Sequence, residues 1–327
     1  MAPSPPSPAA APLSQRVGFD AAHLYPNTPD DIRAELDSVK DLGGGWVRGD
    51  FTWPSIERSR GVYEFSKIDV LVNEVNARGL HLMGQLTYGP AWAGPGGLPT
   101  NNADYADYAA AMARRYAPKG VHAWEIWNEA NLTGPWPGTP DPAKYTAMLK
   151  AAYLAIHAVD PHATVVTSGL APASNVSGYS IRPASFVQGI YDNGGAGYFD
   201  AVGLHPHTTP YPSTIEQPWN PMVQARDLIY PMMQRHGDGA KKIWATEAGF
   251  SVSSNTSKSV TEALQGDRVN LMIHTWLSFP FAGPIFVYLL RDPGSDFSNW
   301  FDGFGLMREN WSHKPGYAVV KSYLHHG

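Results

Sequence analysis

Short apolar segments alternate with longer amphipathic segments along most of the chain, and this alternation constrains the fold more than any other feature. Eight apolar segments have the length and composition of strands buried on both faces: residues 16–20, 45–50, 81–87, 121–128, 164–168, 200–205, 242–247 and 284–290. The segments with helical spacing of apolar residues are 29–42, 65–78, 102–116, 141–159, 183–192, 221–236, 260–279 and 314–324. Strands that alternate with helices predict a parallel sheet.

Eight strand–helix repeats favour a closed (β/α)8 barrel, the TIM barrel, as a single α/β domain. A chain of 327 residues can hold one such barrel, which takes about 250 residues or more. The alternative is an open, doubly wound sheet, but no G-x-G-x-x-G or G-x-x-x-x-G-K-[ST] motif supports a nucleotide-binding version of it. We therefore expect residues 15–327 to form one barrel domain.

Residues 1–14 differ from the rest of the chain in composition. The stretch MAPSPPSPAAAP is rich in Pro, Ala and Ser, which predicts a disordered linker or tail. It lacks the basic start and the apolar stretch of a signal peptide. We expect a secreted or cell-envelope protein of bacterial origin whose export signal has been removed; the alternative is an ordinary tail on a cytosolic protein.

Composition argues against several classes of partner. The formal net charge is −5 and no long run of Lys or Arg occurs, so a nucleic-acid surface is not expected. No stretch of about 18 uninterrupted apolar residues predicts a membrane helix. Cysteine is absent, which excludes a disulfide, a thiolate metal site and a cysteine nucleophile. We expect a monomer that uses no cofactor.

Two glutamates lie where predicted strands meet loops. Residues 124–131 read WEIWNEAN at the end of the fourth strand, and residues 244–250 read WATEAGF at the end of the seventh. The C-terminal ends of TIM-barrel strands face one active site, so Glu129 and Glu247 are expected to share a pocket. Glycosidic cleavage needs such a pair, because one carboxyl protonates the leaving oxygen and the other attacks the anomeric carbon. A lone glutamate would more simply be a surface carboxylate.

The two motifs resemble those of the clan A glycoside hydrolases, which include the cellulase-type family 5 and the β-xylosidase-type family 39. IWNEAN is similar to the N-E-P/A motif of the clan's fourth strand, and TEAGF is similar to its nucleophile strand. The resemblance runs in strand order from about residue 16 to the C-terminus. It implies a (β/α)8 barrel and a carbohydrate substrate, with Glu129 as the acid/base and Glu247 as the nucleophile.

The resemblance also implies roles for Asn128 and Arg48. Asn128 matches the clan's asparagine that bonds the substrate 2-hydroxyl, and is otherwise a turn former at a strand end. Arg48, at the end of the second predicted strand, matches the clan's arginine beside the nucleophile, where a cation keeps Glu247 ionised. The alternative for Arg48 is a structural ion pair with Asp50 or Glu125, and the two roles are compatible.

The sixth predicted strand ends in LHPH, at residues 204–207. In clan A this strand often supplies a His or Tyr that bonds the nucleophile, and the resemblance assigns this role to His205. His207 is expected to contact substrate or to cap a loop. An H-x-H pair also suggests a metal site, but the sequence offers no further spaced set of zinc ligands, so no catalytic metal is expected.

Aromatic residues are candidates for sugar platforms, since their flat apolar rings match the CH-rich faces of sugars. Where many clan members carry a Trp on the eighth strand this chain has Tyr288, so the expected platform is Tyr288, Trp276 or Trp300. Trp136 lies in a Gly/Pro-rich loop after Glu129 and is expected to be exposed and to line a subsite. The other candidate lining residues, each of which could instead be core or loop packing, are Asp20, His23, Tyr88 and Trp92.

Together these features predict a retaining hydrolase of β-type glycosidic bonds in a poly- or oligosaccharide. Gly, Pro and aromatic residues in the loops after the third, fourth and sixth strands favour an open groove and endo action. An exo-acting β-glycosidase, such as a β-xylosidase-like enzyme, is the alternative. The retained glutamate pair disfavours a carbohydrate-binding protein without activity, and the lack of a motif-placed Lys or metal cluster disfavours a barrel lyase or aldolase.

Overall fold

Eight parallel strands close into one barrel in the computed structural model of the chain, which describes residues 11–21, 27–207, 220–254 and 258–327. The strands are β1 (Val17–Asp20), β2 (Trp46–Thr52), β3 (His81–Thr87), β4 (Ala123–Ile126), β5 (Thr164–Val166), β6 (Ala201–Leu204), β7 (Lys242–Ala248) and β8 (Ala282–Val287). Each strand pairs with the next, and Gly18 of β1 pairs with Phe286 of β8 to close the ring. The predicted (β/α)8 fold is confirmed.

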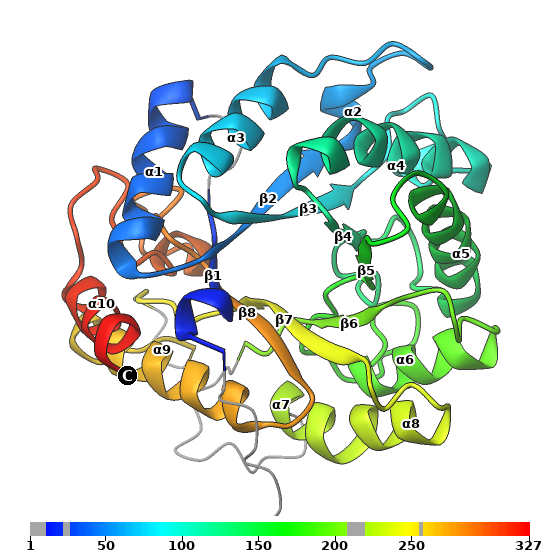
Figure 1. Cartoon of the computed structure of the whole chain (residues 1–327). Helices are drawn as coiled ribbons and strands as arrows, with labels where there is room; N and C mark the ends of the chain where they lie inside the picture. Colours follow the sequence, from blue (N-terminus) through cyan, green and yellow to red (C-terminus); the bar gives the residue numbers. More distant parts are fainter. Residues whose placement is uncertain (1–10, 22–26, 208–219, 255–257) are drawn as a thin grey trace, which may run out of the picture.

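The helices form an outer ring around the strands (Figure 1). They are α1 (Pro29–Leu42), α2 (Trp53–Ile56), α3 (Ser66–Ala77), α4 (Asn102–Tyr116), α5 (Pro142–Val159), α6 (Pro183–Asp192), α7 (Pro221–Gln224), α8 (Tyr230–Arg235), α9 (Glu262–Ser278) and α10 (Pro315–His326). The helix predicted over 221–236 is interrupted by a π turn, Ala225–Ile229, between α7 and α8. The short helix α2, directly after β2, has no counterpart in the prediction.

Local chemistry explains where the helices begin. The Asp141 carboxylate accepts hydrogen bonds from the backbone N–H groups of Ala143 and Lys144, and Pro142 occupies the first turn of α5. These interactions satisfy two of the backbone donors that a helix leaves unpaired at its N-terminus. Asp141 is therefore the N-cap of α5, and the helix begins where the apolar spacing predicted.

A layer of apolar side chains fills the inside of the barrel. Its buried members come from six different strands: Met83, Ala123, Val166, Ala201, Trp244 and Phe286. Trp46 packs beside them, with its ring edge-on to the rings of Trp244 and Phe286. The interior is therefore a packed core rather than a pore, as is usual for this fold. The polar side chains lie at the C-terminal ends of the strands.

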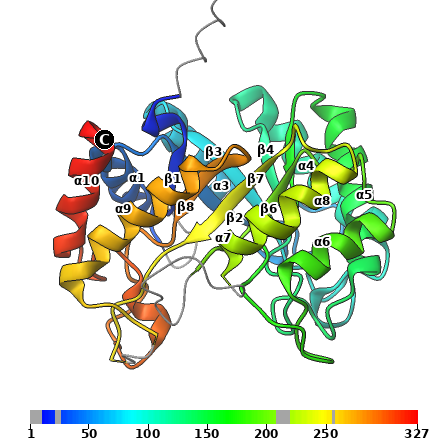
Figure 2. The same cartoon turned by 90° about the horizontal axis from the view of Figure 1, so that it is seen from below.

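The chain enters the barrel at the end opposite to these polar side chains. Leu13–Gln15 forms a single 3₁₀ turn, and the Trp46 indole donates a hydrogen bond to the backbone oxygen of Gln15 at 3.1 Å. In the side view of Figure 2 this turn lies at one end of the barrel, and the loop that follows β8 extends from the other. Residues 1–10, which make up most of the predicted tail, and His23 lie outside the described residues.

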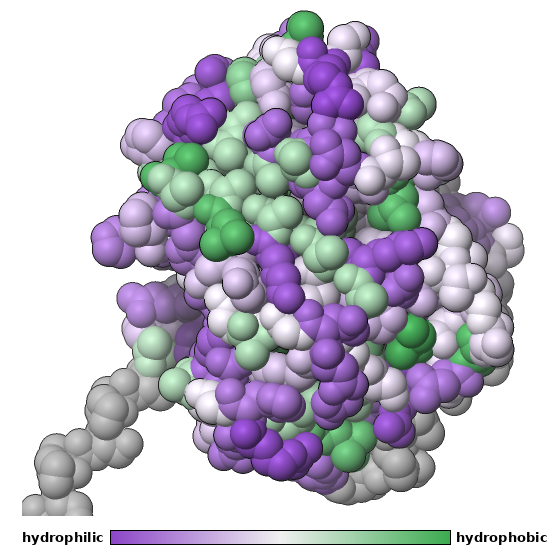
Figure 3. All heavy atoms as spheres, turned by 90° about the vertical axis from the view of Figure 1, so that its right-hand side faces the viewer, coloured by the Kyte–Doolittle hydropathy of each residue, from purple (hydrophilic) through white to green (hydrophobic). Residues whose placement is uncertain are grey.

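The outer surface is mainly polar. Figure 3 shows one face of the molecule, on which hydrophilic side chains surround bands of moderately hydrophobic ones. This pattern is expected of amphipathic helices that turn their apolar sides to the barrel. Among the described residues, no helix is both long and apolar enough to cross a membrane.

A buried ion pair ties the C-terminal part of the chain to the loop after β8. The Lys314 ammonium group lies 2.7 Å from one oxygen of Asp292 and 2.9 Å from the other, and both side chains are fully buried. Burial raises the pKa of Asp292 to about 6 and lowers the pKa of Lys314. The raised pKa of Asp292 and the lowered pKa of Lys314 both show that burial disfavours the charged form more than the opposite charge favours it. Without its partner, either charge would be buried and unpaired, which is costly.

We expect Lys314→Met to destabilise the fold by about 3–5 kcal/mol, because the substitution leaves the buried Asp292 carboxyl without its cation. The matched control is Lys321→Met, which removes an exposed ion pair with Asp41 and should cost less than about 1 kcal/mol. Urea unfolding followed by circular dichroism measures both. Equal losses in the two variants would contradict the importance assigned to the buried pair.

Candidate active site

The two motif glutamates meet at the C-terminal end of the barrel. Glu247 lies in β7, and Glu129 follows β4 by three residues. Glu129 Oε1 lies 3.1 Å from His205 Nδ1, and Glu247 Oε2 lies 3.5 Å from the same nitrogen. The two carboxyl oxygens are therefore no further apart than the sum of these distances, 6.6 Å. The predicted sharing of one pocket agrees with this arrangement.

Arg48, in β2, is the most connected side chain of the site. Its guanidinium group donates to Glu125 at 2.8 Å, to Asp20 at 2.5 Å and to Glu247 at 2.7 Å. It also donates to Asn128 Oδ1 at 3.2 Å. Arg48 is 2% exposed, so these acceptors replace its water. Both sequence interpretations of Arg48 hold, since the ion pair with Glu125 and the contact with Glu247 occur together.

Arg48 and His205 determine the ionisation state of Glu247. Burial by itself would raise the pKa of this carboxyl, but the charges of His205 and Arg48 and a hydrogen bond from His207 oppose that effect. The result is a pKa well below the usual glutamate range. Glu247 is therefore an anion at neutral pH, as a nucleophile must be.

His205, which follows β6, bridges the two glutamates. The resemblance assigned it to the nucleophile alone, but Nδ1 lies closer to Glu129 than to Glu247. Burial opposes protonation of this ring, whereas the charges of Glu247 and Glu129 favour it, and the net effect raises the pKa of His205. His205 Nδ1 thus lies close to both carboxyl groups.

His207 forms the other side of the nucleophile. Its Nε2 lies 3.5 Å from Glu247 Oε2, and its ring packs edge-on against Tyr288 and Phe304 at 5.5 Å from each ring centre. Tyr288 is near enough to Glu247 for that anion, after burial, to raise the pKa of its phenol. His207 and Tyr288 therefore lie at the site as predicted. The ligand atoms of His205, His207 and Glu247 all fall within 4.8 Å of one another, as in a metal site.

Asn128 and Tyr88 form the edge of the site next to β3. Besides Arg48, the amide of Gln85 contacts Asn128 Oδ1 at 2.8 Å, and the Asn128 side chain is hydrogen-bonded to the Tyr88 hydroxyl. Tyr88 as a whole residue is 38% exposed. The structure thus brings both predicted residues to the catalytic pair, with an aromatic ring open to solvent beside them.

The backbone around this edge adopts unusual conformations. Tyr88, Trp127 and Glu129 have positive φ angles of 53°, 72° and 45°. Non-glycine residues rarely adopt this region, and such strained positions cluster at functional sites. Hydrogen bonds hold the turn: the Glu129 N–H donates to Gly169 O at 3.1 Å, and the Trp127 indole donates to Pro135 O at 2.9 Å. Two of these conformations occur at and just before Glu129, whose carboxyl group contacts His205.

Sequence reasoning missed two residues of the site. A Cβ at Gly169, after β5, would lie 2.1 Å from His205 Nε2 and 2.3 Å from Thr246 Oγ1, so only glycine fits. No sequence signal marks this close approach. Gln85 was detectable in principle, because it is an amide near the C-terminal end of the buried β3 segment, HLMGQLT.

Two aromatic predictions are wrong. Trp136 is 1% exposed rather than open to solvent, because its loop folds inward and packs the indole against Trp127 and Tyr145. Trp276 is fully buried on α9, where it packs against Phe281 and donates a hydrogen bond to the Gly283 backbone. A side chain covered in this way is core, and Trp276 cannot form the sugar platform.

Two further aromatics occupy loops around the barrel mouth. Trp92, after β3, packs edge-on against Trp53, lies under the Arg60 guanidinium and donates to Glu57 O at 3.1 Å. These contacts assign it to loop packing. Trp300 packs against Phe304, whose ring contacts Tyr288, so Trp300 supports the wall that carries Tyr288.

One buried amide holds two of these loops together. Gln265 of α9 has its Nε2 at 3.0 Å from Phe250 O, in the loop after β7. The same nitrogen is 3.2–3.3 Å from the backbone oxygens of Gly303, Phe304 and Gly305, in the loop after β8. An amide nitrogen carries two hydrogens, so these carbonyls share them. The loop behind the nucleophile is thereby joined to the loop behind Tyr288.

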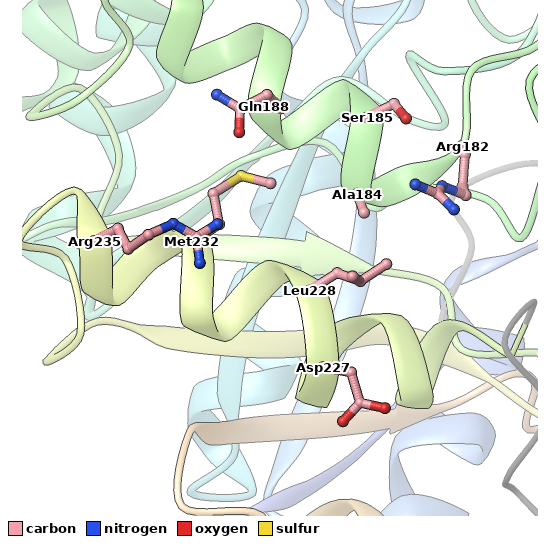
Figure 4. Close-up of a pocket in the computed structure, with 8 residues that line it drawn as sticks. All are labelled: Arg182, Ala184, Ser185, Gln188, Asp227, Leu228, Met232 and Arg235. Atoms are coloured by element: carbon pink, nitrogen blue, oxygen red, sulfur yellow. The ribbon is translucent and has the colours of Figure 1, made fainter.

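Two of the cavities around the described part of the barrel differ in their relation to the glutamates. One, of about 390 Å³, lies between α6 and α8 and is lined by Arg182, Leu228 and Met232, among others, on the outside of the barrel (Figure 4). The other, of about 380 Å³, is lined by Asp50, Tyr288 and Arg291, among others, and adjoins the site through Tyr288. The second cavity is therefore placed to hold part of a ligand bound at the glutamates.

Solved structures resemble this chain across 95% of its length. They include a family 39 glycoside hydrolase from Bacteroides cellulosilyticus (TM-score 0.76, 21% identity, 64% of that chain covered) and a monomeric β-xylosidase from Caulobacter crescentus (0.69, 18%, 68%). An endo-1,4-β-mannanase from Rhizomucor miehei also matches (0.63, 16%, 94%). The chain spans less than two thirds of the first of these. At such identities the likeness establishes the fold.

The family is established by sequence. No curated protein matches the chain, but a family model, Cellulase (glycosyl hydrolase family 5), matches residues 16–275. This match spans β1 to α9 and includes both motif glutamates. The chain therefore belongs to the cellulase family, glycosyl hydrolase family 5.

Proposed function

We propose that this glycoside hydrolase cleaves β-type glycosidic bonds of a poly- or oligosaccharide with retention of configuration, with Glu247 as nucleophile and Glu129 as acid/base. The observation that carries the proposal is the convergence of both carboxyl groups on His205 Nδ1, with Arg48 bound to Glu247 alone of the two. One carboxyl is held as an anion, and the other is free of that cation. This asymmetry is what two different catalytic roles require.

In the first step, Glu247 attacks the anomeric carbon and Glu129 donates a proton to the leaving oxygen. The bond from the sugar to its leaving group breaks as the bond to Glu247 forms, which gives a glycosyl-enzyme. In the second step, Glu129 takes a proton from water, and the water displaces Glu247 from the sugar. The contacts of Arg48 with Glu247 and Asn128, which put a cation and an amide beside the proposed nucleophile, support this sequence of steps.

The distance between the glutamates supports retention. Retaining enzymes hold their carboxyl groups about 5–5.5 Å apart, whereas inverting enzymes need about 6.5–9.5 Å to admit a water molecule. The facing oxygens lie at most 6.6 Å apart, which is compatible with the spacing of a retaining pair.

We propose endo action, with exo action as the second candidate. The exposed ring of Tyr88 and the partly exposed Glu129 side chain, at 22%, support an open groove on the β3 and β4 side. The exo alternative is favoured by the cavity at Tyr288 and Arg291, across the barrel from β4. There the Arg291 guanidinium is held by Glu35 at 2.8 Å and Asn27 at 2.9 Å, which forms a fixed wall.

The Pro/Ala/Ser-rich start supports a secreted or cell-envelope location, and we propose a monomer.

Glu247→Ala is expected to lower kcat by about 10⁴-fold or more, since the nucleophile belongs to a unit whose loss removes the chemical step. Added azide should restore turnover of an aryl β-glycoside by entering the space of the lost carboxylate, and the product should be an α-glycosyl azide. Proton NMR of the product reads its configuration.

Glu129→Ala is the companion variant. It should lose about 10²–10⁴-fold with poor leaving groups, which need a proton, and much less with a dinitrophenyl leaving group. Azide should then yield the β-glycosyl azide. Equal losses with both leaving groups, or full activity of Glu247→Ala, would refute the assignment of roles.

Arg48→Gln is expected to move the acidic limb of the kcat/KM profile upward by about one to three pH units. Removing a cation in contact with a carboxyl raises the pKa of that carboxyl by this amount, so Glu247 becomes protonated at higher pH than in the unaltered enzyme. Arg33→Gln, which removes a surface arginine bound to Glu74 and Asp30, is the control and should leave the limb in place. Arg48→Lys provides the same test if Arg48→Gln unfolds, with a smaller shift.

The first products from reducing-end-labelled cello-, xylo- and mannopentaose distinguish endo from exo action. We expect internal cleavage, with labelled di- and trisaccharides formed before any labelled tetrasaccharide. Release of a single sugar from the non-reducing end, leaving labelled tetrasaccharide, would support the exo alternative. Glu247→Ala in the same assay controls for contaminating glycosidases.

A further inference from the structure

We propose that His205, His207 and Glu247 bind a divalent transition-metal ion such as Zn²⁺, and that the ion inhibits the enzyme reversibly by occupying its nucleophile. The three residues converge from the end of β6 and from β7. Their ligand atoms are His205 Nδ1, His207 Nε2 and Glu247 Oε2, which lie within 4.8 Å of one another.

The spacing of these atoms suits a tetrahedral ion. Zinc bonds of about 2.0–2.1 Å at tetrahedral angles place neighbouring ligand atoms about 3.3–3.4 Å apart. Glu247 Oε2 lies 3.5 Å from His205 Nδ1 and 3.5 Å from His207 Nε2. Glu129 Oε1, at 3.1 Å from His205 Nδ1, is within reach of a fourth position. The third pair, His205 Nδ1 and His207 Nε2, lies within 4.8 Å, so the two imidazoles must approach each other by up to about 1.5 Å before both bind the ion.

The donor set and the charge both favour such an ion. Two imidazoles with a carboxylate suit zinc or copper, whereas magnesium and calcium prefer oxygen ligands alone. Three carboxylates, Asp20, Glu125 and Glu247, bind the guanidinium of Arg48. A fourth, Glu129, contacts His205 instead. Arg48 contacts Glu247 Oε1, so the other oxygen, Oε2, is the one that points to the imidazoles.

The surroundings of the two rings distinguish an inhibitory ion from a resident one. A metal-bound histidine usually donates its other ring N–H to an acceptor, and loss of that partner costs about 10–100-fold in affinity. Within the described part of the chain, His205 Nε2 and His207 Nδ1 have no hydrogen-bond partner. We therefore infer moderate affinity. With Arg48 on one oxygen of Glu247 and the ion on the other, neither oxygen remains for attack on the sugar.

Isothermal titration of the full chain with ZnCl₂, in a buffer that does not chelate zinc, tests the site. We expect one ion to bind at this site, and we expect its Kd to equal the inhibition constant of Zn²⁺ in aryl β-glycoside hydrolysis. EDTA should restore the activity. His207→Gln should weaken this binding at least about tenfold, and circular dichroism confirms that the variant is folded. Glu247→Gln, which keeps the size of the side chain, makes the same test if His207→Gln unfolds.

The control is the double variant His325→Ala/His326→Ala, which removes the exposed histidine pair at the end of α10 and should bind zinc as the unaltered chain does. Unchanged binding by His207→Gln, or loss of binding in the double variant, would overturn the proposal. Titration detects the ion without turnover. A chain that binds zinc but hydrolyses no glycoside would therefore refute the proposed function and leave the metal site intact.

Discussion

The buried guanidinium group of Arg48 is the interaction on which the rest of the site depends. It lies inside the mouth of the barrel and binds carboxylates from β1, β4 and β7. Neither the arginine nor Asp20 and Glu125 could be buried alone, because an unpaired charge in such surroundings is very costly. The closed order of the strands brings these groups together, so the same contact both completes the barrel mouth and ionises Glu247.

The two glutamates differ in what surrounds them rather than in their own chemistry. Glu247 is enclosed by Arg48, His205 and His207, and its pKa is depressed. Glu129 stands on a strained turn, is partly exposed and contacts His205. His205 contacts both carboxyl groups, so a change of charge at one glutamate alters the electrostatic environment of the other through this buried ring.

Much of this arrangement was predictable from the sequence. The spacing of apolar residues predicted the strands and helices. The two glutamate motifs identified Glu129 and Glu247, because each motif lies at the end of a strand. One error concerns a helix, since Trp276 of α9 faces the core rather than the site, and the others concern loops. Trp136 was expected to be exposed since it lies among Gly and Pro, but loop composition does not say which way an indole turns. Gly169 escaped notice because its role is to have no side chain where His205 and Thr246 approach, and such contacts exist only in three dimensions.

The shared contacts of Gln265 bear on how this scaffold can be diversified. One amide on α9 bonds carbonyls of the loop after β7 and of the loop after β8. Substrate preference in a TIM barrel changes mainly by exchange of such loops. Here neither loop can be replaced by itself without leaving a buried carbonyl or the amide unsatisfied. Evolution or engineering of this chain would therefore have to transplant the pair, together with the helix between them, as one cassette.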